Sequence, residues 1–408
     1  MRRVQIPGMR QFHAIKPLAG KLLGLTAARA IGQACSMVAS ILLARWLGPT
    51  EFGAYAIAIS IFTAVSGVFS LGIPAFALRA AALGQMQATG YSLFLNVIMS
   101  TSAAIIGTAI AFVFSGLPLL PMILIALAVA IESNGELRVG LGTEFGYTRI
   151  VNIFLISRGI LVLLGMLLLS YLGLPALTAF LTTRAIVVAI AAFWLMHRVN
   201  GPWRSTSKAP TDGSLRPLKH MGITSAFVAL KSFDVAILGA VASATTAGLF
   251  SAVTRITMPI GLLSGSLSVV AMGPSTRSSA SKAKRTVYYL AAIAVVGLAI
   301  AGVLSIWSTQ IVTLIFGAEF KAAAGALRWI LIGVPALGTV GVMSTVMQAQ
   351  GRTRDIAWQV GVTSTLSLIL VPVLAVYFGA TGAAMAFAIV LWLGLILRLN
   401  TARQLIGE

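Results

Sequence analysis

Eight ionisable side chains lie deep inside the apolar stretches of this sequence. Six are cations and two are acids: Arg29, Arg158, Arg184, Lys231, Arg255 and Arg328 against Glu132 and Asp234. Each cation lies about eight or more residues inside its stretch, which is about 12 Å along a helix. At the centre of a bilayer an ionised group costs about 2.5–3.5 kcal/mol even on insertion scales, so it normally faces water or an opposite charge. The surplus of positive charge favours an anionic ligand.

The sequence therefore predicts a cationic cavity. If its ligand carries a diphosphate, arginine fits it well, because the planar guanidinium donates two parallel hydrogen bonds to phosphate oxygens. We expect this cavity to be lined by Arg29, Lys231, Asp234 and Arg255, with Arg158, Arg184, Arg328, Glu132 and Gln33 as secondary candidates.

Both acids have cations within reach. Asp234 follows Lys231 by three residues, so the two share one face of a helix and can form an ion pair. Such a pair is either a structural bridge or a group that responds to protons or ions and sets the charge of the cavity. Glu132 can pair with Arg158 in a similar way, or extend with Glu136 toward the cytoplasmic end of its stretch.

The composition is that of a membrane protein. Hydrophobic residues make up 58% of the 408 residues and charged residues 9%, and the mean hydropathy is +0.98. Crossing a hydrocarbon core takes about 20 apolar residues in a helix, far more than a barrel strand needs. Twelve such spans are expected, at about 22–47, 52–73, 91–115, 118–138, 149–172, 175–197, 221–243, 247–273, 286–316, 320–350, 354–377 and 380–398. The first span lacks the cleavage site of a signal peptide, so we expect it to stay attached.

Basic residues fix the expected orientation, because Lys and Arg beside spans are retained on the cytoplasmic side. With both termini inside, 21 of the 29 Lys and Arg fall in cytoplasmic segments and two, Arg45 and Lys321, fall in outer loops. The predicted topology therefore has an even number of spans, with cytoplasmic N- and C-termini. This bias also accounts for most of the net charge of +20. Nucleic acid is not expected as a partner, since short scattered loops form no continuous basic groove.

A hydrophilic linker divides the chain into halves. It is RVNGPWRSTSKAPTDGSLRPLKH, residues 198–220. Two motifs recur across it: EFGAYA and TAGLFS place Gly53 and Gly248 195 residues apart, and YLGLPALTAF and YFGATGAAMAF recur 206 residues apart. The sequence thus predicts two six-helix lobes in tandem. The expected divisions are a basic N-terminal segment (1–21), an N-terminal lobe (22–197), the linker, a C-terminal lobe (221–400) and a tail (401–408).

Several motifs resemble those of the polysaccharide biosynthesis (O-antigen, Wzx-type) flippases of the multidrug/oligosaccharidyl-lipid/polysaccharide exporter superfamily. They are ARWLGPTEFGAYAIAIS (44–60), FDVAILGAVASATTAGLFSAVTRI (233–256), LIFGAEFKAAAGALRWI (314–330), QGRTRD (350–355) and YFGATGAAMA (377–386). The resemblance implies two lobes around a central cavity with alternating access. It also implies a polyprenyl-diphosphate-linked oligosaccharide as substrate, and polysaccharide polymerase or assembly proteins as possible partners. The resemblance implies no catalytic residue and no cofactor. A coupling ion or proton is possible, and its identity is not predicted.

Polar stripes indicate which spans line the cavity. In the first two spans the stripes comprise Thr26, Arg29, Gln33, Ser36 and Ser40, then Ser60, Thr63, Ser66 or Gly67, and Ser70. The corresponding spans of the second half carry Lys231 and Asp234, then Ser251, Thr254 and Arg255. Spans one, two, seven and eight are therefore the expected walls. For the hydroxyl groups alone, the alternative is that they join helices by hydrogen bonds.

The sequence lacks the residue patterns of catalytic, metal-binding and nucleotide-binding sites. The three histidines lie at span ends or in hydrophilic segments, Cys35 is alone, and no phosphate-binding GxxxxGK[ST] loop is present. We therefore expect neither an enzyme nor a metal site. Two alternatives to the flippase remain open: a drug/cation antiporter of the same superfamily, which would favour an acidic cavity, and a membrane enzyme or scaffold that transports nothing.

The predicted orientation is tested by cysteine labelling in intact cells. Cysteine at Lys208 should react only from the cytoplasmic side, and cysteine at Thr245 only from the outside. The opposite pattern would refute the orientation and the argument from basic loops.

Overall fold

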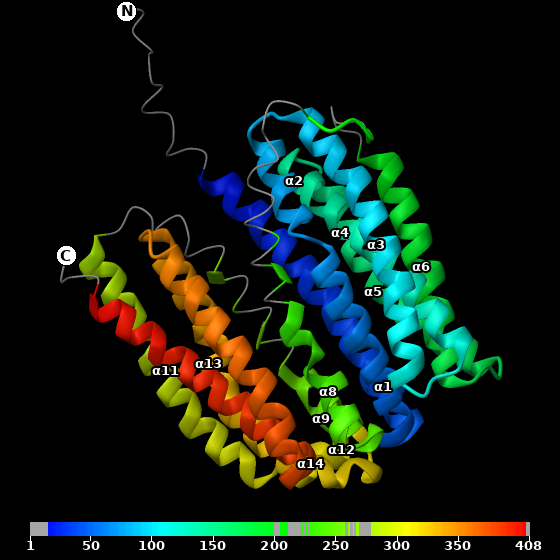
Figure 1. Ribbon diagram of the computed structural model, residues 1–408, viewed down its shortest axis with the longest axis vertical. Helices are drawn as coiled ribbons and strands as arrows, with labels where there is room; N and C mark the ends of the chain where they lie inside the picture. Colours follow the sequence, from blue (N-terminus) through cyan, green and yellow to red (C-terminus); the bar gives the residue numbers. More distant parts are fainter. Residues whose placement is uncertain are drawn as a thin grey trace, which may run out of the picture.

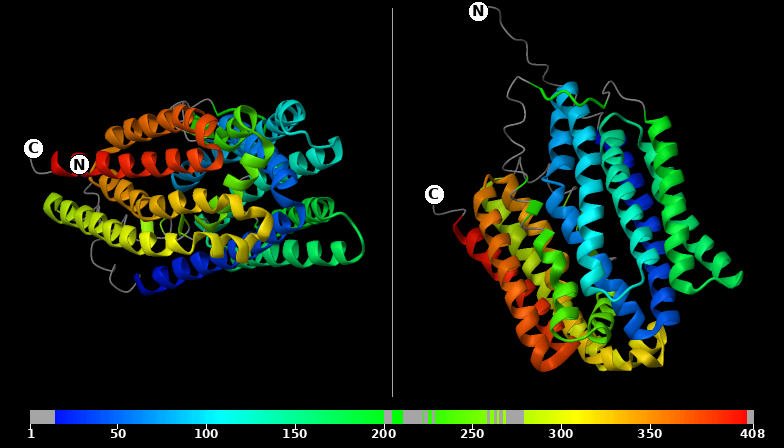
Figure 2. Two further views of the ribbon diagram at one scale, coloured as in Figure 1. Left: turned by 90° about the horizontal axis from the view of Figure 1, so that it is seen from below. Right: turned by 45° about the vertical axis from the view of Figure 1, so that its right-hand side comes forward.

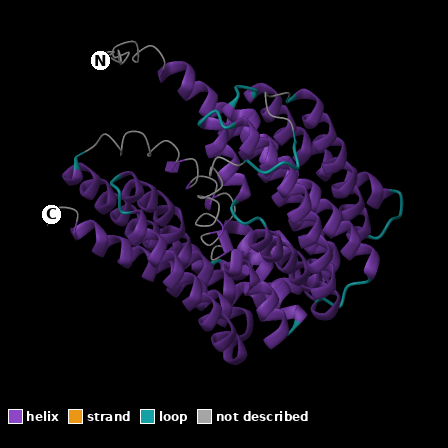
Figure 3. Cartoon of the chain, turned by 45° about the horizontal axis from the view of Figure 1, so that its top comes forward, coloured by secondary structure: helices purple, strands orange, loops and turns teal. Residues whose placement is uncertain are grey.

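The computed structural model describes residues 15–199, 205–210, 229–257 and 279–404, together with 222, 225–226, 260–261, 264 and 267–268. Within these ranges the chain forms helices and no strand, as the colouring of Figure 3 shows. The expected all-helical fold is therefore confirmed.

The N-terminal lobe is built from six helices. They are α1 (Ile15–Phe69), α2 (Ile73–Ala82), α3 (Met86–Phe114), α4 (Leu119–Glu144), α5 (Thr148–Tyr171) and α6 (Ala176–Arg198). Helix α1 contains two expected spans, because it turns back on itself at Gly48, whose φ of 69° lies in the left-handed region that glycine tolerates. Pro49 then begins the returning arm. We refer to residues 15–47 as the first arm and residues 49–69 as the second arm.

The C-terminal lobe contains shorter pieces and another hairpin. The described elements are η1 (Lys231–Phe233), α8 (Asp234–Val241), α9 (Ala244–Thr254), η2 (Arg255–Thr257), α11 (Ala280–Ile306), α12 (Ser308–Phe316), η3 (Ala318–Ala323), α13 (Ala324–Ala349) and α14 (Thr353–Gln404). Helix α14 reverses at Gly379, which has a φ of 57° and separates the last two expected spans.

Most expected spans coincide with helices, and two differences stand out. The expected span 286–316 is wrong as one helix: α11 ends at Ile306 and α12 starts anew at Ser308. Helix α2 was not expected; it follows the left-handed Gly72, with Pro74 in its first turn. Parts of the expected spans 221–243 and 247–273, and of the linker, lie outside the described residues.

This is a multi-pass membrane protein. Eight described helices are long and apolar enough to cross a membrane, and those in α1 and α14 are 46 and 51 residues long, enough for two crossings each. Large apolar side chains are exposed along the outside of the bundle, such as Ile105 (67%), Val113 (72%) and Leu314 (77%). In a bilayer these side chains face lipid.

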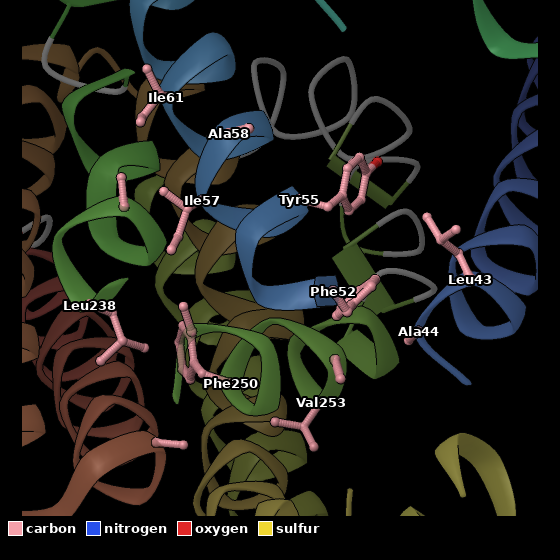
Figure 4. Close-up of a cluster of buried hydrophobic side chains, with 14 of the residues drawn as sticks. Leu43, Ala44, Phe52, Tyr55, Ile57, Ala58, Ile61, Leu238, Phe250 and Val253 are labelled. Carbon is pink, nitrogen blue, oxygen red and sulfur yellow. The ribbon is translucent and has the colours of Figure 1, made fainter. Parts of the chain in front are cut away.

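Among the described residues, the hydrophobic core is shared between the lobes at one end. One cluster joins α1, α5 and α6 to α8, α9, α13 and α14; Figure 4 shows its side chains from α1, such as Phe52 and Ile57, packed beside Leu238 and Phe250. Two other clusters lie within single lobes, one around Phe154 and Leu195, the other around Met343 and Leu395. Figures 1 and 2 show the same arrangement, with the described helices joined near the turn of α1 and splayed toward the end bearing both termini. By the predicted orientation, the joined end faces outward.

A local two-fold relation organises the joined end. Gly53 lies against the backbone of Ala244, and Gly248 lies against the backbone of Pro49, so each contact maps onto the other at an offset of 195 residues. Between them, the hydroxyl oxygens of Thr50 and Thr245 are 2.9 Å apart, again at that offset. The structure thus confirms the tandem repeat that the recurring glycines predicted.

The glycine crossing predicts a clear effect of small substitutions. In Gly53→Ala or Gly248→Ala the new Cβ would overlap a backbone carbonyl of the other lobe, and overpacking of this kind costs about 1–3 kcal/mol. Each substitution should lower the thermal midpoint of the detergent-solubilised protein.

Two other glycines provide matched controls. Gly302 in α11 and Gly361 in α14 have nothing within 4 Å of an added Cβ. Alanine there should leave the midpoint unchanged or raise it, because alanine favours helix by about 1 kcal/mol over glycine. Equal effects at all four positions would contradict the crossing.

Candidate functional site

A cavity of about 530 Å³ lies between the lobes, just inside the shared core. It is lined by Ala56, Ile59, Ser60, Thr63, Lys231, Ser232, Asp234, Val235, Ser251, Thr254 and Arg255. One wall is the second arm of α1, and the other is formed by η1, α8, α9 and η2. Three of the four residues predicted for the cavity, Lys231, Asp234 and Arg255, meet here, together with five hydroxyl-bearing side chains.

Lys231 and Asp234 are positioned by a break in the helix that carries them. Lys231–Phe233 form a single 3₁₀ turn, and the α-helix restarts at Asp234. Such a restart leaves backbone N–H groups without partners inside the helix, and within a membrane they must find partners elsewhere. The Asp234 side chain accepts a hydrogen bond from the N–H of Val235 at 2.8 Å. The carboxylate also lies at the positive end of the α8 dipole, which stabilises it.

A second hydrogen-bond partner for the backbone at this helix break comes from the other lobe. Ser60 of α1, which is 7% exposed, accepts a hydrogen bond from the N–H of Ala236 at 3.2 Å and donates one to the carbonyl oxygen of Ser232. One hydroxyl thus bridges both sides of the break. The backbone that presents Lys231 and Asp234 to the cavity is held by the N-terminal lobe.

The expected ion pair between Lys231 and Asp234 does not form in this structure. Among the described residues, the ion pairs within 4.0 Å do not include either side chain. Both side chains therefore enter the cavity without a direct bridge between them.

Arg255 connects the cavity to a polar network in the N-terminal lobe. It is half-buried in η2, and no carboxylate of the described chain lies within 4.0 Å of it. It lies within electrostatic range of Tyr55 and Arg184. Arg184 in turn lies within electrostatic range of Tyr55, whose ring packs edge-on against Phe180 at 5.9 Å.

The secondary candidates Glu132, Arg158 and Arg184 form an ion cluster inside the N-terminal lobe. Glu132 of α4 accepts a hydrogen bond from Arg184 of α6 at 2.6 Å and forms an ion pair with Arg158 of α5 at 3.2 Å. Arg158 also pairs with Glu136 at 2.9 Å. The expected pairing of Glu132 with Arg158 is confirmed, and the cluster ties three helices together without lining the cavity.

The remaining candidates lie elsewhere. Arg29 and Gln33 are exposed on the first arm of α1 and are not among the residues that line the cavity. Arg328 is exposed near the start of α13, where it donates to the hydroxyl of Ser308 at 2.9 Å. The structure therefore does not bring Arg328 to the cavity.

Sequence reasoning missed three residues. Ser60 and Tyr55 carry no charge; the polar stripe of the second span included Ser60, but nothing indicated its contact with another backbone. Arg398 was counted among the cytoplasmic residues, and nothing in the sequence indicated that its side chain is buried. It is 4% exposed inside the C-terminal lobe and donates to Ser344 and to the carbonyl oxygen of Gly394, both at 2.8 Å.

The role of Ser60 is tested by removing its hydroxyl. Ser60→Ala leaves the N–H of Ala236 without a partner, and such a buried loss costs about 1–3 kcal/mol. The thermal midpoint should fall, and a cysteine at Asp234 should change its reaction rate with a small thiol reagent.

Thr63→Ala is the matched control. Thr63 lines the same cavity one turn away, but its hydroxyl bonds only to Ile59 of its own helix at 2.7 Å. Its loss should change neither quantity. Equal effects from both substitutions would mean that Ser60 does not hold the break.

Comparison with known proteins agrees with this architecture. The chain is similar to an inward-facing multidrug resistance MATE transporter of the MOP superfamily, with 13% identity, a TM-score of 0.71 and coverage of 94% of this chain and 98% of that one. It is also similar to the lipid II flippase MurJ in an inward closed conformation, with 16% identity, a TM-score of 0.72 and coverage of 93% and 87%. At these identities the likeness establishes the fold: two helical lobes of the multidrug/oligosaccharidyl-lipid/polysaccharide type.

The family follows from the sequence itself. A search of curated proteins found no match. A family profile described as "Polysaccharide biosynthesis protein" matches residues 42–325, which is more than half of the chain. This range contains the α1 turn, the glycine crossing and every residue that lines the cavity. The chain therefore belongs to the polysaccharide biosynthesis protein family.

Proposed function

We propose that the protein is a flippase that carries a polyprenyl-diphosphate-linked oligosaccharide across the bacterial inner membrane by alternating access. Both termini are cytoplasmic in this proposal, and the lobes are residues 22–197 and 221–400. The lipid tail stays in the bilayer while the diphosphate and sugars pass between the lobes. Polysaccharide polymerase or assembly proteins would receive the product.

The cavity between the lobes is the observation that carries this proposal. It contains two cations, Lys231 and Arg255, against one acid, Asp234, and its remaining polar groups are hydroxyls. Guanidinium, ammonium and hydroxyl groups are all hydrogen-bond donors suited to phosphate and sugar oxygens. At about 530 Å³ the cavity has the size of a small-molecule site, so it would hold the diphosphate and the nearest sugar rather than a whole oligosaccharide.

The residues divide the work by position. Arg255 would bind the diphosphate through its two-pronged guanidinium, and Lys231 would add a second positive charge. Asp234 would balance that charge while the cavity is empty, and could exchange a coupling ion or proton. Arg29, exposed on the first arm, would meet the anion first on its way from the cytoplasmic side.

A drug/cation antiporter is the second candidate, because several structures of similar fold are multidrug transporters. Organic cations favour carboxylates, and the cavity has one acid against two cations. The charge of the cavity therefore supports the flippase. The direct test is a reconstituted liposome assay with a labelled lipid-diphosphate oligosaccharide and, separately, a fluorescent organic cation. Movement of the cation alone would refute the flippase.

The proposed phosphate contact predicts the result of substituting Arg255. A charge-assisted hydrogen bond contributes about 1.5–3 kcal/mol, so Arg255→Ala should lower lipid-diphosphate movement about tenfold or more. Arg255→Lys should recover part of it, because lysine keeps the charge but lacks the fork. Arg29→Ala should also lower the rate.

Arg328→Ala is the control, since Arg328 is also a cation inside a predicted span but bonds to Ser308 away from the cavity. It should keep nearly full activity. If Arg255→Ala and Arg29→Ala both transport at the normal rate at normal protein levels, the cationic-cavity mechanism is refuted.

A further inference from the structure

One contact line between the lobes continues along the whole second arm of α1. Starting at the turn, Thr50 meets Thr245, Gly53 meets Ala244, and the side chain of Ile57 lies against Gly239. Residue numbers rise along the second arm and fall along its partner, as in an antiparallel helix pair. We call this line the seam.

Beyond the cavity the seam continues to the opposite end. Ser60 bonds to Ser232 and Ala236, and the Cα of Gly67 faces the side chain of Ala229. The hydroxyl oxygens of Ser70 and Ser225 are 3.1 Å apart. A Cβ on Gly222 would lie 3.0 Å from the carbonyl oxygen of Leu71.

The seam is built from small residues at heptad spacing. Gly53, Ser60 and Gly67 repeat every seven residues on the second arm, and Gly222, Ala229 and Ala236 do so on the partner. Small residues let helix backbones approach closely within a membrane. Toward the end of the second arm the contacts are made by Gly67 with Ala229 and by Ser70 with Ser225, and such small side chains permit a change in crossing angle without repacking.

The two ends of the seam lie in different surroundings. The outer end is embedded in the core that both lobes share. At the cytoplasmic end the core clusters formed by the described residues are separate, yet Ser70 still meets Ser225. The contact between Ser70 and Ser225 is thus present although the two lobe cores do not meet at the cytoplasmic end.

This inference rests on alternating access, which is part of the proposed function. In alternating access the cytoplasmic sides of the two lobes come together when their outer sides separate. A contact already made while the cytoplasmic sides are apart is compatible with both states. The contacts of Thr50 and Gly53 with the other lobe are compatible only with the closed outer side. We infer that the cytoplasmic end of the seam persists throughout the cycle and acts as the axis of lobe motion, while its outer end opens.

Two cysteine pairs test this directly, because each replaces two hydroxyls already in contact. In a Cys35→Ala background, Ser70→Cys with Ser225→Cys links the cytoplasmic end, and Thr50→Cys with Thr245→Cys links the outer end. Lipid-diphosphate movement in liposomes is measured after oxidation and again after reduction. The oxidised outer pair should lose transport and regain it on reduction, whereas the oxidised cytoplasmic pair should keep most of it. Loss in the oxidised cytoplasmic pair with recovery on reduction, or full activity of the oxidised outer pair, would overturn the inference.

A second measurement does not depend on the cargo. Gly248→Leu would wedge the outer crossing, because Gly248 lies against Pro49 and Gly53. Disulfide formation in membranes should then slow for the outer pair and stay unchanged for the cytoplasmic pair. Equal slowing of both pairs would mean that the seam parts as a unit, and the inference would fail. If the reduced variants and the parent protein move no lipid diphosphate while these rates differ as expected, the proposed cargo is wrong and the seam stands.

Discussion

Close packing of two glycines, Gly53 and Gly248, is the constraint on which the joined end of this protein depends. Each lies against the backbone of the opposite lobe, so the second arm of α1 and α9 cross without side chains between them. That approach lets Phe52, Ile57, Leu238 and Phe250 form one core from two repeats. In a membrane, where lipid competes with protein for apolar surface, such close backbone contact is a main source of helix association. The cavity lies just inside this crossing because the crossing fixes the distance between its walls.

The backbone of the C-terminal lobe also depends on a side chain of the N-terminal lobe. The break between η1 and α8 exposes polar backbone groups at a depth where water is scarce. Ser60 supplies a donor and an acceptor at that point, and Asp234 supplies an acceptor from within the break. Asp234 therefore needs no direct ion pair with Lys231 to be accommodated inside the span. It lies at the start of a helix, where a negative charge is favoured. Because Ser60 belongs to the other lobe, the shape of this site and the packing of the lobes are linked.

The sequence predicted most of the fold and part of the site, and the division has physical reasons. Turns at Gly48 and Gly379 were found because glycine-rich motifs interrupt apolar runs, and Lys231, Asp234 and Arg255 were found because charges inside spans are costly. The 3₁₀ turn was missed because KSFDVAIL contains neither proline nor glycine; the hydroxyl of Ser60 that bonds to the turn lies 172 residues away in sequence. The burial of Arg398 was not predicted, because a position near the end of a span does not reveal a side chain that bonds to Ser344 and Gly394. Contacts between lobes are not encoded in local periodicity.

The second arm of α1 contacts the opposite lobe with one face and lines the cavity with a neighbouring face. Gly53 and Gly67 meet the opposite lobe, whereas Ala56, Ile59 and Thr63 line the cavity; Ser60 takes part in both. Changes at the three lining positions can alter the size and polarity of the cavity while leaving the lobe contact intact. Related chains could therefore diverge at these positions one residue at a time without losing the contact between the lobes. Ser60 is the position where such divergence would be most restricted.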